Sequence, residues 1–439
     1  MVLSLCSVAV GEGETKEVKT FRIVCPAGGD SNPPASEWWI WQKYEEMTGI
    51  HIEWEEIPES ALNDRKNLIM MSDEKPDAFW HVSWSSEELA RYGASGAFVN
   101  IAPYLDTTAS NLKTLLTEEV PDGLKSITMD DGGIYGMPWV MTDKPQTNAR
   151  FYLNKNWLKN VGMEPPTTTE ELYQVQMADW WSKGYFYPET FGKYEYESWV
   201  TDGKVNDVVG MYGWGDAAFL YSDASQDYVG IAALEGPDGD KVQSWCDYPV
   251  RGIGTFVITD ACDDPEALIK WGDFFYSPEG TTFAAYGTEG ETYTLDENGQ
   301  IVYCDDILNY DGGAQLGAWQ YGFFVYGGSF PWRSYDSKTM EHARKNDVEG
   351  FTGERFSDYV EDSEKYSAKL MPGMIPTAEE ADQVSPFLTD SDSYVQEARM
   401  KFVTGQWNFD SDWDAYVNQL NAMGAEDYIT VKQAQYDRY

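Results

Sequence analysis

Apolar residues in the first hundred positions of the chain follow two periods in alternation. Residues 18–25 form a short run rich in β-branched side chains, and 50–55 alternate apolar with polar, so both predict strands. Residues 37–48 and 61–71 carry apolar side chains three or four positions apart, which predicts helices, and 76–80 predict another buried strand. This β-α-β-α-β order predicts a parallel sheet covered by helices on both faces.

The same patterns continue, less regularly, along the rest of the chain. Residues 150–154 and 252–259 predict strands, and a helix is expected from Asp264 onward because Pro265 suits a first helical position. Residues 296–300 predict a hairpin turn rather than a calcium loop, which needs more carboxylates at alternate positions. The last fifty residues are predicted to be mostly helical.

The charge balance restricts the partners of the protein. Asp and Glu number 74 against 31 Lys and Arg, which gives a formal net charge of -43. Such a field repels phosphate backbones and anionic lipid surfaces, so we expect no nucleic-acid partner. Solubility is the simplest reason for the excess of acidic residues.

Aromatic residues are unusually frequent: 18 Trp, 29 Tyr and 19 Phe. Tyr and Trp combine a large apolar face with a hydrogen-bonding edge, which suits the partly apolar, partly hydroxylated faces of sugars. Core packing accounts for most of these rings, and a minority remains for a binding surface.

No residue pattern indicates catalysis, a cofactor or a metal. Three histidines lie far apart, and five cysteines show no CxxC spacing, so neither a zinc site nor a disulfide framework is expected. The chain has no nucleophile elbow, P-loop, dinucleotide glycine fingerprint or HExxH motif. We therefore predict a protein that is not an enzyme.

The first residues are typical of an export signal. Residues 1–14 read as the remnant of one, and 3–6 (LSLC) resemble a bacterial lipoprotein cleavage box with Cys6 as the lipidated residue, although Leu5 is larger than usual there. The alternatives are ordinary cleavage three to five residues later, or a frayed start of the first strand. Because no other apolar run reaches the ~20 residues of a membrane helix, a lipid anchor is the expected membrane contact.

A series of short segments extends over nearly the whole chain: 76–80 (PDAFW), 89–93 (LARYG), 96–101 (GAFVNI), 131–138 (DGGIYGMP), 151–158 (FYLNKNWL), 165–172 (PPTTTEEL), 265–280 (PEALIKWGDFFYSPEG), 287–293 (GTEGETY), 413–420 (WDAYVNQL) and 436–439 (YDRY). In this order they resemble the family 1 extracellular solute-binding proteins, the receptors of carbohydrate ABC transporters. The sequence departs from that family between 172–175 and 177–184, where a long stretch of the second lobe is missing.

The resemblance implies an α/β, two-lobed periplasmic-binding-protein-like (type II) fold with a hinge between the lobes. Residues 15–144 and 252–312 would form the N-terminal lobe, and 145–251 and 313–439 the C-terminal lobe, shortened near 175. It also implies an extracellular, monomeric receptor that captures a mono- or oligosaccharide between the lobes and delivers it to ABC transporter permease subunits.

The candidate ligand-binding residues follow from position and residue type. Trp80 ends a short buried strand, where it either stacks on a ligand or packs in the core, and Trp214 lies between two glycines that leave its ring uncovered. The full set is Trp80, His81, Ser83, Trp84, Trp139, Trp214, Asp216, Trp245 and Trp332. Because of the net charge, we expect weak or no binding of anionic sugars.

Two other functions remain open. A secreted glycoside hydrolase would show sustained turnover, and a stand-alone carbohydrate-binding surface protein would lack hinge motion.

Overall fold

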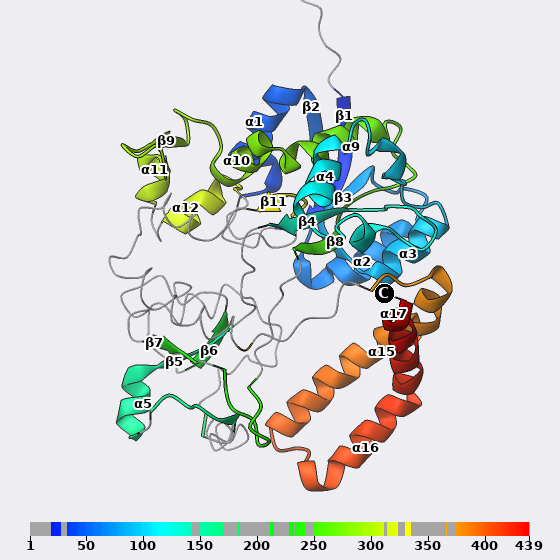
Figure 1. Ribbon diagram of the computed structural model, residues 1–439, viewed down its shortest axis with the longest axis vertical. Coiled ribbons are helices and arrows are strands. Elements are labelled where there is room, and N and C mark those ends of the chain that lie inside the picture. Colours follow the sequence, from blue (N-terminus) through cyan, green and yellow to red (C-terminus); the bar gives the residue numbers. More distant parts are fainter. Residues whose placement is uncertain are drawn as a thin grey trace, which may run out of the picture.

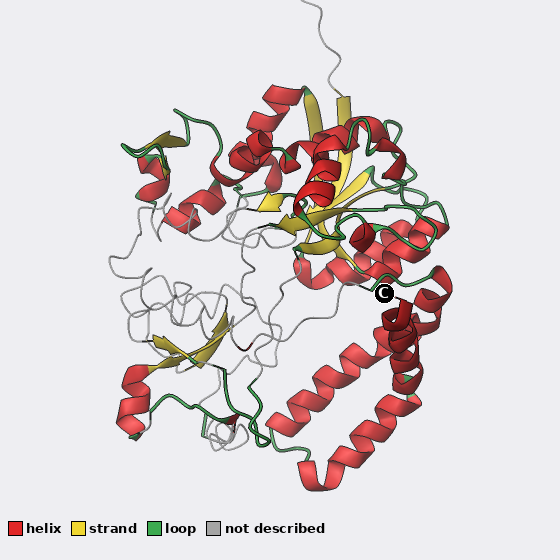
Figure 2. Cartoon of the chain, viewed as in Figure 1, coloured by secondary structure: helices red, strands yellow, loops and turns green. Residues whose placement is uncertain are grey.

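The computed structural model describes most of the first third of the chain, the C-terminal helices and parts of the middle: residues 19–27, 33–142, 150–162, 164–169, 183–184, 211–214, 228–231, 233–241, 249–310, 314–323, 330–334, 366 and 374–438. Figure 1 shows a large sheet enclosed by helices, a small separate sheet, and three C-terminal helices beside them. Figure 2 shows the same layers by type of secondary structure.

The large sheet has six strands in the order β11-β4-β8-β3-β1-β2. Its strands are β1 (Lys19–Pro26), β2 (Ile50–Ile57), β3 (Ala78–Trp84), β4 (Met137–Met141), β8 (Val250–Ile258) and β11 (Arg333–Ser334). β1 pairs in parallel with both β2 and β3, as the alternating pattern predicts. β8 runs antiparallel to its neighbours β3 and β4, so the sheet is mixed.

Helices cover both faces of this sheet. Successive side chains of a strand point to opposite faces, and here both faces carry buried apolar side chains. In β1, Ile23 and Cys25 belong to one buried cluster and Val24 to the other. The first face is covered by α1 (Trp39–Thr48), α4 (Ser110–Thr114), α9 (Pro265–Asp273) and α10 (Pro278–Tyr286), and the second by α2 (Glu59–Met70) and α3 (Ser86–Ala94). The predicted two-sided layering is confirmed.

Several predicted boundaries also agree with the structure. α1 ends at Gly49, whose φ of 69° gives the left-handed cap that glycine adopts at little cost. α9 begins after Asp264, whose carboxylate accepts a hydrogen bond from the backbone N–H of Ala267. The predicted turn at 296–300 joins β9 (Tyr293–Leu295) to β10 (Ile301–Tyr303).

Shorter elements fill the connections around the sheet: η1 (Ala35–Glu37), η2 (Ala102–Tyr104), η3 (Leu115–Glu119), η4 (Lys125–Ile127), η7 (Phe274–Tyr276) and α11 (Asp305–Leu308). Next comes α12 (Ala314–Gln320), which lies before β11 in the chain. Ala318, Phe323 and Trp332 belong to the same buried cluster as the strands of the large sheet. Residues 314–323 and 330–334 therefore pack with the large sheet, and the division of the chain into two lobes stays a prediction.

The small sheet lies apart from the large one and has the order β6-β5-β7. Its strands are β5 (Arg150–Asn154), β6 (Met211–Trp214) and β7 (Tyr228–Gly230), and α5 (Lys155–Val161) follows β5 directly. The chain passes from β4 to β5 after residue 142, and it returns to the large sheet when it enters β8 at Val250.

The described C-terminal residues form α15 (Ala378–Val403), α16 (Phe409–Ala422) and α17 (Ala425–Arg438), which confirms the predicted helical character of the last fifty residues. The first turns of α15 pack against α3, where Ala381 is buried in the second cluster of the large sheet. Within the described ranges, none of the helices has the length and apolar character needed to cross a membrane.

Candidate functional site at the carboxyl edge of the large sheet

One edge of the large sheet collects the carboxyl ends of five strands. β1, β2, β3, β4 and β11 all run in the same direction, while β8 begins at this edge with Val250. The chain leaves toward the small sheet from here, after β4, and comes back here into β8. In open α/β sheets ligands bind outside the carboxyl ends of the strands, so this edge is the candidate site.

A bulge shapes the end of β3. Trp80 pairs with Phe256 and Trp84 with Gly254, so three residues of β3 lie opposite a single residue of β8. His81, the first of the three, has a φ of 57°, in the left-handed region that a non-glycine residue enters at a cost of about 1–3 kcal/mol. The bulge brings His81 to a half-buried position and leaves Ser83 exposed, whereas Val82 between them is buried.

Aromatic and cationic side chains lie beside this bulge. The ring of His81 stacks on Phe330, with centroids 4.0 Å apart and planes tilted by 20°. Trp139 of β4 is half-buried, and its indole N–H donates a 3.0 Å hydrogen bond to the hydroxyl of Ser334. The guanidinium of Arg251, opposite Trp139 in the β4–β8 register, lies 5.2 Å from the indole centroid.

The short segment 330–334 contacts both the bulge of β3 and Trp139 of β4. Phe330, at its start, contacts His81, and Ser334, at its end, contacts Trp139. The segment is held to β4 by the backbone N–H of Val140, which donates to the carbonyl of Trp332. His81, Trp139, Arg251, Phe330 and Ser334 are therefore linked through this segment, and we call them the edge cluster, although Ser334 itself is buried.

Tyr276 also fixes β4. The phenol of Tyr276 donates a 2.5 Å hydrogen bond to the carbonyl of Pro138, immediately before Trp139. Tyr276 is completely enclosed, and burial raises its pKa well above the usual value, so it remains a neutral donor at any physiological pH. Trp139 thus follows a residue held by a buried hydrogen bond, and its half-buried side chain packs against the same cluster as Tyr276.

Three of the candidate ligand-binding residues do not reach the edge. Trp80 is only 2% exposed and packs against Trp41, Trp271 and Phe275, with centroid distances between 5.0 and 5.6 Å. Trp84, in the second buried cluster, and Trp332, in the first, are likewise enclosed. For Trp80 the core alternative is the one that the structure supports, and we remove all three from the proposed site.

The remaining candidates divide into two groups. His81, Ser83 and Trp139 lie at the edge, and their contact with a ligand stays a prediction. Trp214 ends β6 of the small sheet, where its backbone pairs with Arg150, and its side chain lies outside the described residues. Asp216, Trp245 and Cys6 also lie outside the described residues.

Sequence reasoning missed Arg251 and Phe330. Arg251 follows the point where the chain re-enters the large sheet, and its register opposite Trp139 depends on which strands are neighbours. Phe330 comes from a segment that the sequence does not mark as part of the sheet. Within the described ranges, no group of three or more His, Cys, Asp or Glu residues is placed to hold a metal ion.

A separate small pocket lies at the opposite edge of the sheet, near the start of β2. It is lined by Ser36, Trp41, Gln42, Tyr44, Glu45, Ile50, His51, Ile52, Trp54 and Trp271. It lies at the amino ends of the strands and away from the edge cluster, so we do not assign the ligand to it.

The match to a known family decides what kind of protein this is. Residues 30–282, more than half of the chain, match the family model described as bacterial extracellular solute-binding protein. The chain belongs to this family. The family's members are binding receptors rather than enzymes, which confirms both the predicted resemblance and the predicted absence of catalysis.

Individual relatives of this family member are distant. FusA of Streptococcus pneumoniae, a fructooligosaccharide ABC transporter substrate-binding protein, is 23% identical in an alignment covering 97% of this chain and 91% of the relative. Lipoprotein LipO of Bacillus subtilis is 26% identical over 40% of this chain and 34% of the relative. The FusA alignment spans 513 positions, more than the 439 residues of this chain, so FusA has residues without a counterpart here. Where those residues fall stays a prediction, near 175.

Solved structures give the fold. FusA in complex with kestose superposes with a TM-score of 0.74 at 21% identity, covering 96% of this chain and 99% of that chain. The alginate-binding protein AlgQ2 gives 0.76 at 19% identity with the same coverage. These matches confirm the predicted α/β solute-binding protein fold.

Proposed function

We propose that this protein is an extracellular receptor that captures a mono- or oligosaccharide against the edge cluster and delivers it to the permease of an ABC transporter. The observation that carries the proposal is the contact of Arg251 with the ring of Trp139 at the carboxyl edge of the sheet, with His81 stacked on Phe330 at the bulge of β3. Aromatic faces stack on the apolar faces of sugars, and a guanidinium donates to their hydroxyl oxygens.

The relatives support the class of ligand without naming the sugar. FusA, AlgQ2 and the N-glycan transport protein NgtS of S. pneumoniae are described as binding fructooligosaccharide, alginate and N-glycan respectively. AlgQ2 shows that this fold also serves anionic sugars. For this chain we propose a neutral ligand, because a net charge of -43 disfavours a polyuronate.

The second lobe would supply the other wall of the site. In our proposal it comprises the region around the small sheet, including Trp214 and Asp216, and the first lobe also takes in 314–323 and 330–334 because of their contacts with the large sheet. Closure of the two lobes around the ligand would create the shape that the permease recognises.

The proposed location is the outer surface of the cell membrane, with Cys6 as the lipid-bearing residue and the receptor as a monomer. A family of extracellular proteins that includes a lipoprotein relative supports this placement. Metabolic labelling with an alkyne fatty acid tests it directly: the full-length protein takes up label, and Cys6→Ser abolishes the uptake. Equal labelling of both proteins would contradict the anchor.

A thermal-shift screen tests the ligand proposal. The panel contains neutral fructo-, manno- and galacto-oligosaccharides, with oligogalacturonate as the anionic member. A ligand at a hundred times its Kd stabilises the folded state by about 2.7 kcal/mol, which is a readily measured rise in Tm. A rise with a neutral sugar and no product after hours supports the receptor. Product formation would favour the glycoside hydrolase, and micromolar binding of oligogalacturonate in calorimetry would overturn the neutral ligand.

A further inference from the structure

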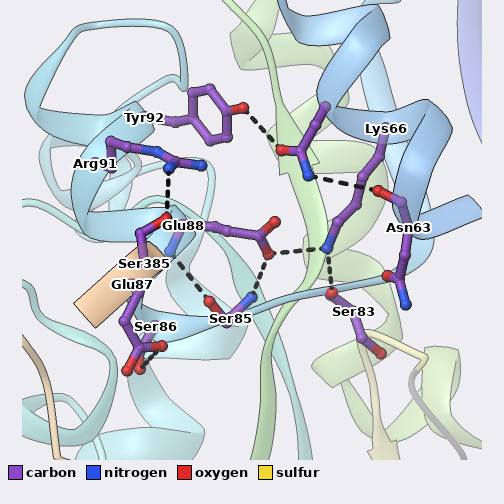
Figure 3. A network of polar contacts seen from close by, with 11 residues as sticks. Asn63, Lys66, Ser83, Ser85, Ser86, Glu87, Glu88, Arg91, Tyr92 and Ser385 are labelled. Carbon is purple, nitrogen blue, oxygen red and sulfur yellow. Dashed lines mark hydrogen bonds and ion pairs between the residues drawn. The ribbon is translucent and has the colours of Figure 1, made fainter. Parts of the chain in front are cut away.

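A buried lysine lies directly beneath the bulge of β3. Lys66, in the middle of α2, is 4% exposed, and its ammonium donates hydrogen bonds to the carbonyl of Ser83 (3.0 Å) and to a carboxylate oxygen of Glu88 (2.8 Å). The same ammonium lies 4.6 Å from the ring centroid of Trp84. Figure 3 shows the lysine reaching from α2 to the end of β3 and the start of α3.

Glu88 ties this contact to the first turn of α3. Its Oε2 atom accepts the bond from Lys66 and also one from the backbone N–H of Ser85 (2.9 Å), while the hydroxyl of Ser85 accepts from the N–H of Glu88 (3.1 Å). One carboxylate oxygen is therefore shared by a helix capping box and a buried ion pair. A helix, a strand end and a second helix are held together at this point.

The contacts on Lys66 leave its ammonium little freedom. A buried cation needs polar partners, and two partners of this ammonium belong to the segment from Ser83 to Glu88. A movement of the bulge would therefore break contacts of the ammonium. The indole N–H of Trp84 is buried and has no acceptor among the described residues. The contact that Trp84 makes here is through the face of its ring, which covers the ammonium of Lys66.

The bulge needs such a support. His81 adopts a left-handed conformation, and a strained residue persists only where its surroundings over-determine it. The carbonyl of Ser83, two residues further on, is the point at which Lys66 holds the chain. His81 and Ser83 are also the two residues of β3 that are not buried.

We propose that Lys66 and Glu88 are positioning residues that hold the bulge of β3 in the conformation presenting His81 and Ser83 to the ligand, without touching the ligand themselves. The expected effect on ligand binding rests on the proposed function. The support of the bulge rests only on the contacts of Lys66 and Glu88. A site whose supporting residues are fixed before binding loses less entropy when the ligand arrives.

The test uses three variants of the whole protein. Lys66→Met removes the ammonium and keeps an unbranched side chain. Glu88→Gln removes the charge but keeps an amide oxygen that accepts from Ser85. Lys75→Met is the matched control, because Lys75 makes an ion pair of the same 2.8 Å length with Asp260, away from the bulge.

Two quantities are measured for each variant: amide hydrogen exchange at 81–86 in the ligand-free protein, and the Kd of the best sugar from the screen. For Lys66→Met we expect about tenfold faster exchange and about tenfold weaker binding, which corresponds to about 1.4 kcal/mol. Glu88→Gln is expected to show about threefold effects, and Lys75→Met less than about twofold changes in both. If Lys66→Met fails to fold, Glu88→Gln carries the same comparison.

The outcomes separate this proposal from the proposed function. Unchanged exchange at 81–86 overturns the positioning role, whatever the binding data show. Faster exchange with an unaltered Kd overturns its consequence for the ligand. If the wild-type protein binds no sugar at all, the receptor proposal fails, while the exchange data still decide whether Lys66 holds the bulge.

Discussion

The aromatic cluster inside the large sheet and the edge cluster at its carboxyl end are built from similar residues but have different partners. Trp80 is surrounded by other rings, which leave no surface for a ligand. Trp139 contacts a hydroxyl and a guanidinium and keeps part of its ring exposed. A core tryptophan and a candidate binding tryptophan are therefore distinguished by the groups that contact the indole, and not by a place at the end of a strand.

The largest expected effect is a loss of stability when the interior aromatic cluster is changed. Trp80→Ala should lower the free energy of unfolding by about 3–5 kcal/mol, because it removes a large buried side chain and leaves a cavity. Urea unfolding followed by circular dichroism measures this. Trp413→Ala, at a residue 46% exposed in α16, is the control and should change the free energy far less. A loss below about 1 kcal/mol for Trp80→Ala would contradict its place in the core.

A second change tests the bulge from the side of β8. A Cβ added at Gly254 would lie 2.6 Å from the Cβ of Trp84 and 2.7 Å from its carbonyl oxygen, and the latter is backbone that cannot rotate away. Gly254→Ala should therefore lower the free energy of unfolding by about 1–3 kcal/mol. If chemical denaturation gives the wild-type value, β3 and β8 are not packed this closely.

The edge cluster should respond in binding more than in stability. Trp139→Ala is expected to weaken sugar binding at least about tenfold, or about 1.4 kcal/mol, and to lower stability less than Trp80→Ala does. Trp139→Phe keeps a ring for stacking and should restore part of the affinity. Calorimetry of the three proteins measures this, and an unchanged Kd in Trp139→Ala would exclude this ring as a ligand contact.

The smallest effect concerns the C-terminal helices, which pack beside α3 on the large sheet. Lys432 of α17 pairs with Glu87 at 2.7 Å, and Arg438 pairs with Glu380 of α15. Burial is the largest single influence on Glu87 and would raise its pKa, but the hydrogen bond and charge of Lys432, together with hydrogen bonds from the backbone and from Ser86, outweigh it, so the pKa is lowered. The hydrogen bond from Arg438 likewise lowers the pKa of Glu380.

Because both folded pKa values lie below those of the unfolded chain, these pairs stabilise the protein above the unfolded pKa of about 4.3 and lose that effect as pH falls. Amide exchange of α17 should therefore accelerate below about pH 4 before β1 and β3 are affected. Lys432→Met should reduce the pH dependence of this exchange, and the part due to Arg438 and Glu380 should remain. If the amides of α17 and of the sheet begin to exchange together at every pH, α17 is not held by a separate, acid-sensitive set of contacts.

The sequence predicts the layered part of the fold well, because strand and helix periods are local. The parallel β1–β2–β3 unit, the helix after Asp264 and the turn at 296–300 all follow from such patterns. The bulge does not, because it depends on the pairing of β3 with β8, more than 160 positions later in the chain. That bulge is also why adjacent Trp80 and His81 have different environments.

The same reason limits prediction of the site. Arg251 and Phe330 join the edge cluster through strand order, and Trp332 is buried because its segment docks beside β4. A residue type can suggest a contact with sugar, but neighbours distant in sequence decide whether its ring is exposed.

Fluorine NMR of protein labelled with 5-fluorotryptophan tests the central claim most directly. Trp139→Phe and Trp80→Phe identify the two resonances, and the sugar from the screen is then titrated in. We predict that the Trp139 resonance shifts with ligand concentration while the Trp80 resonance stays in place. A shift at Trp80 with no change at Trp139 would contradict a ligand site at the edge cluster.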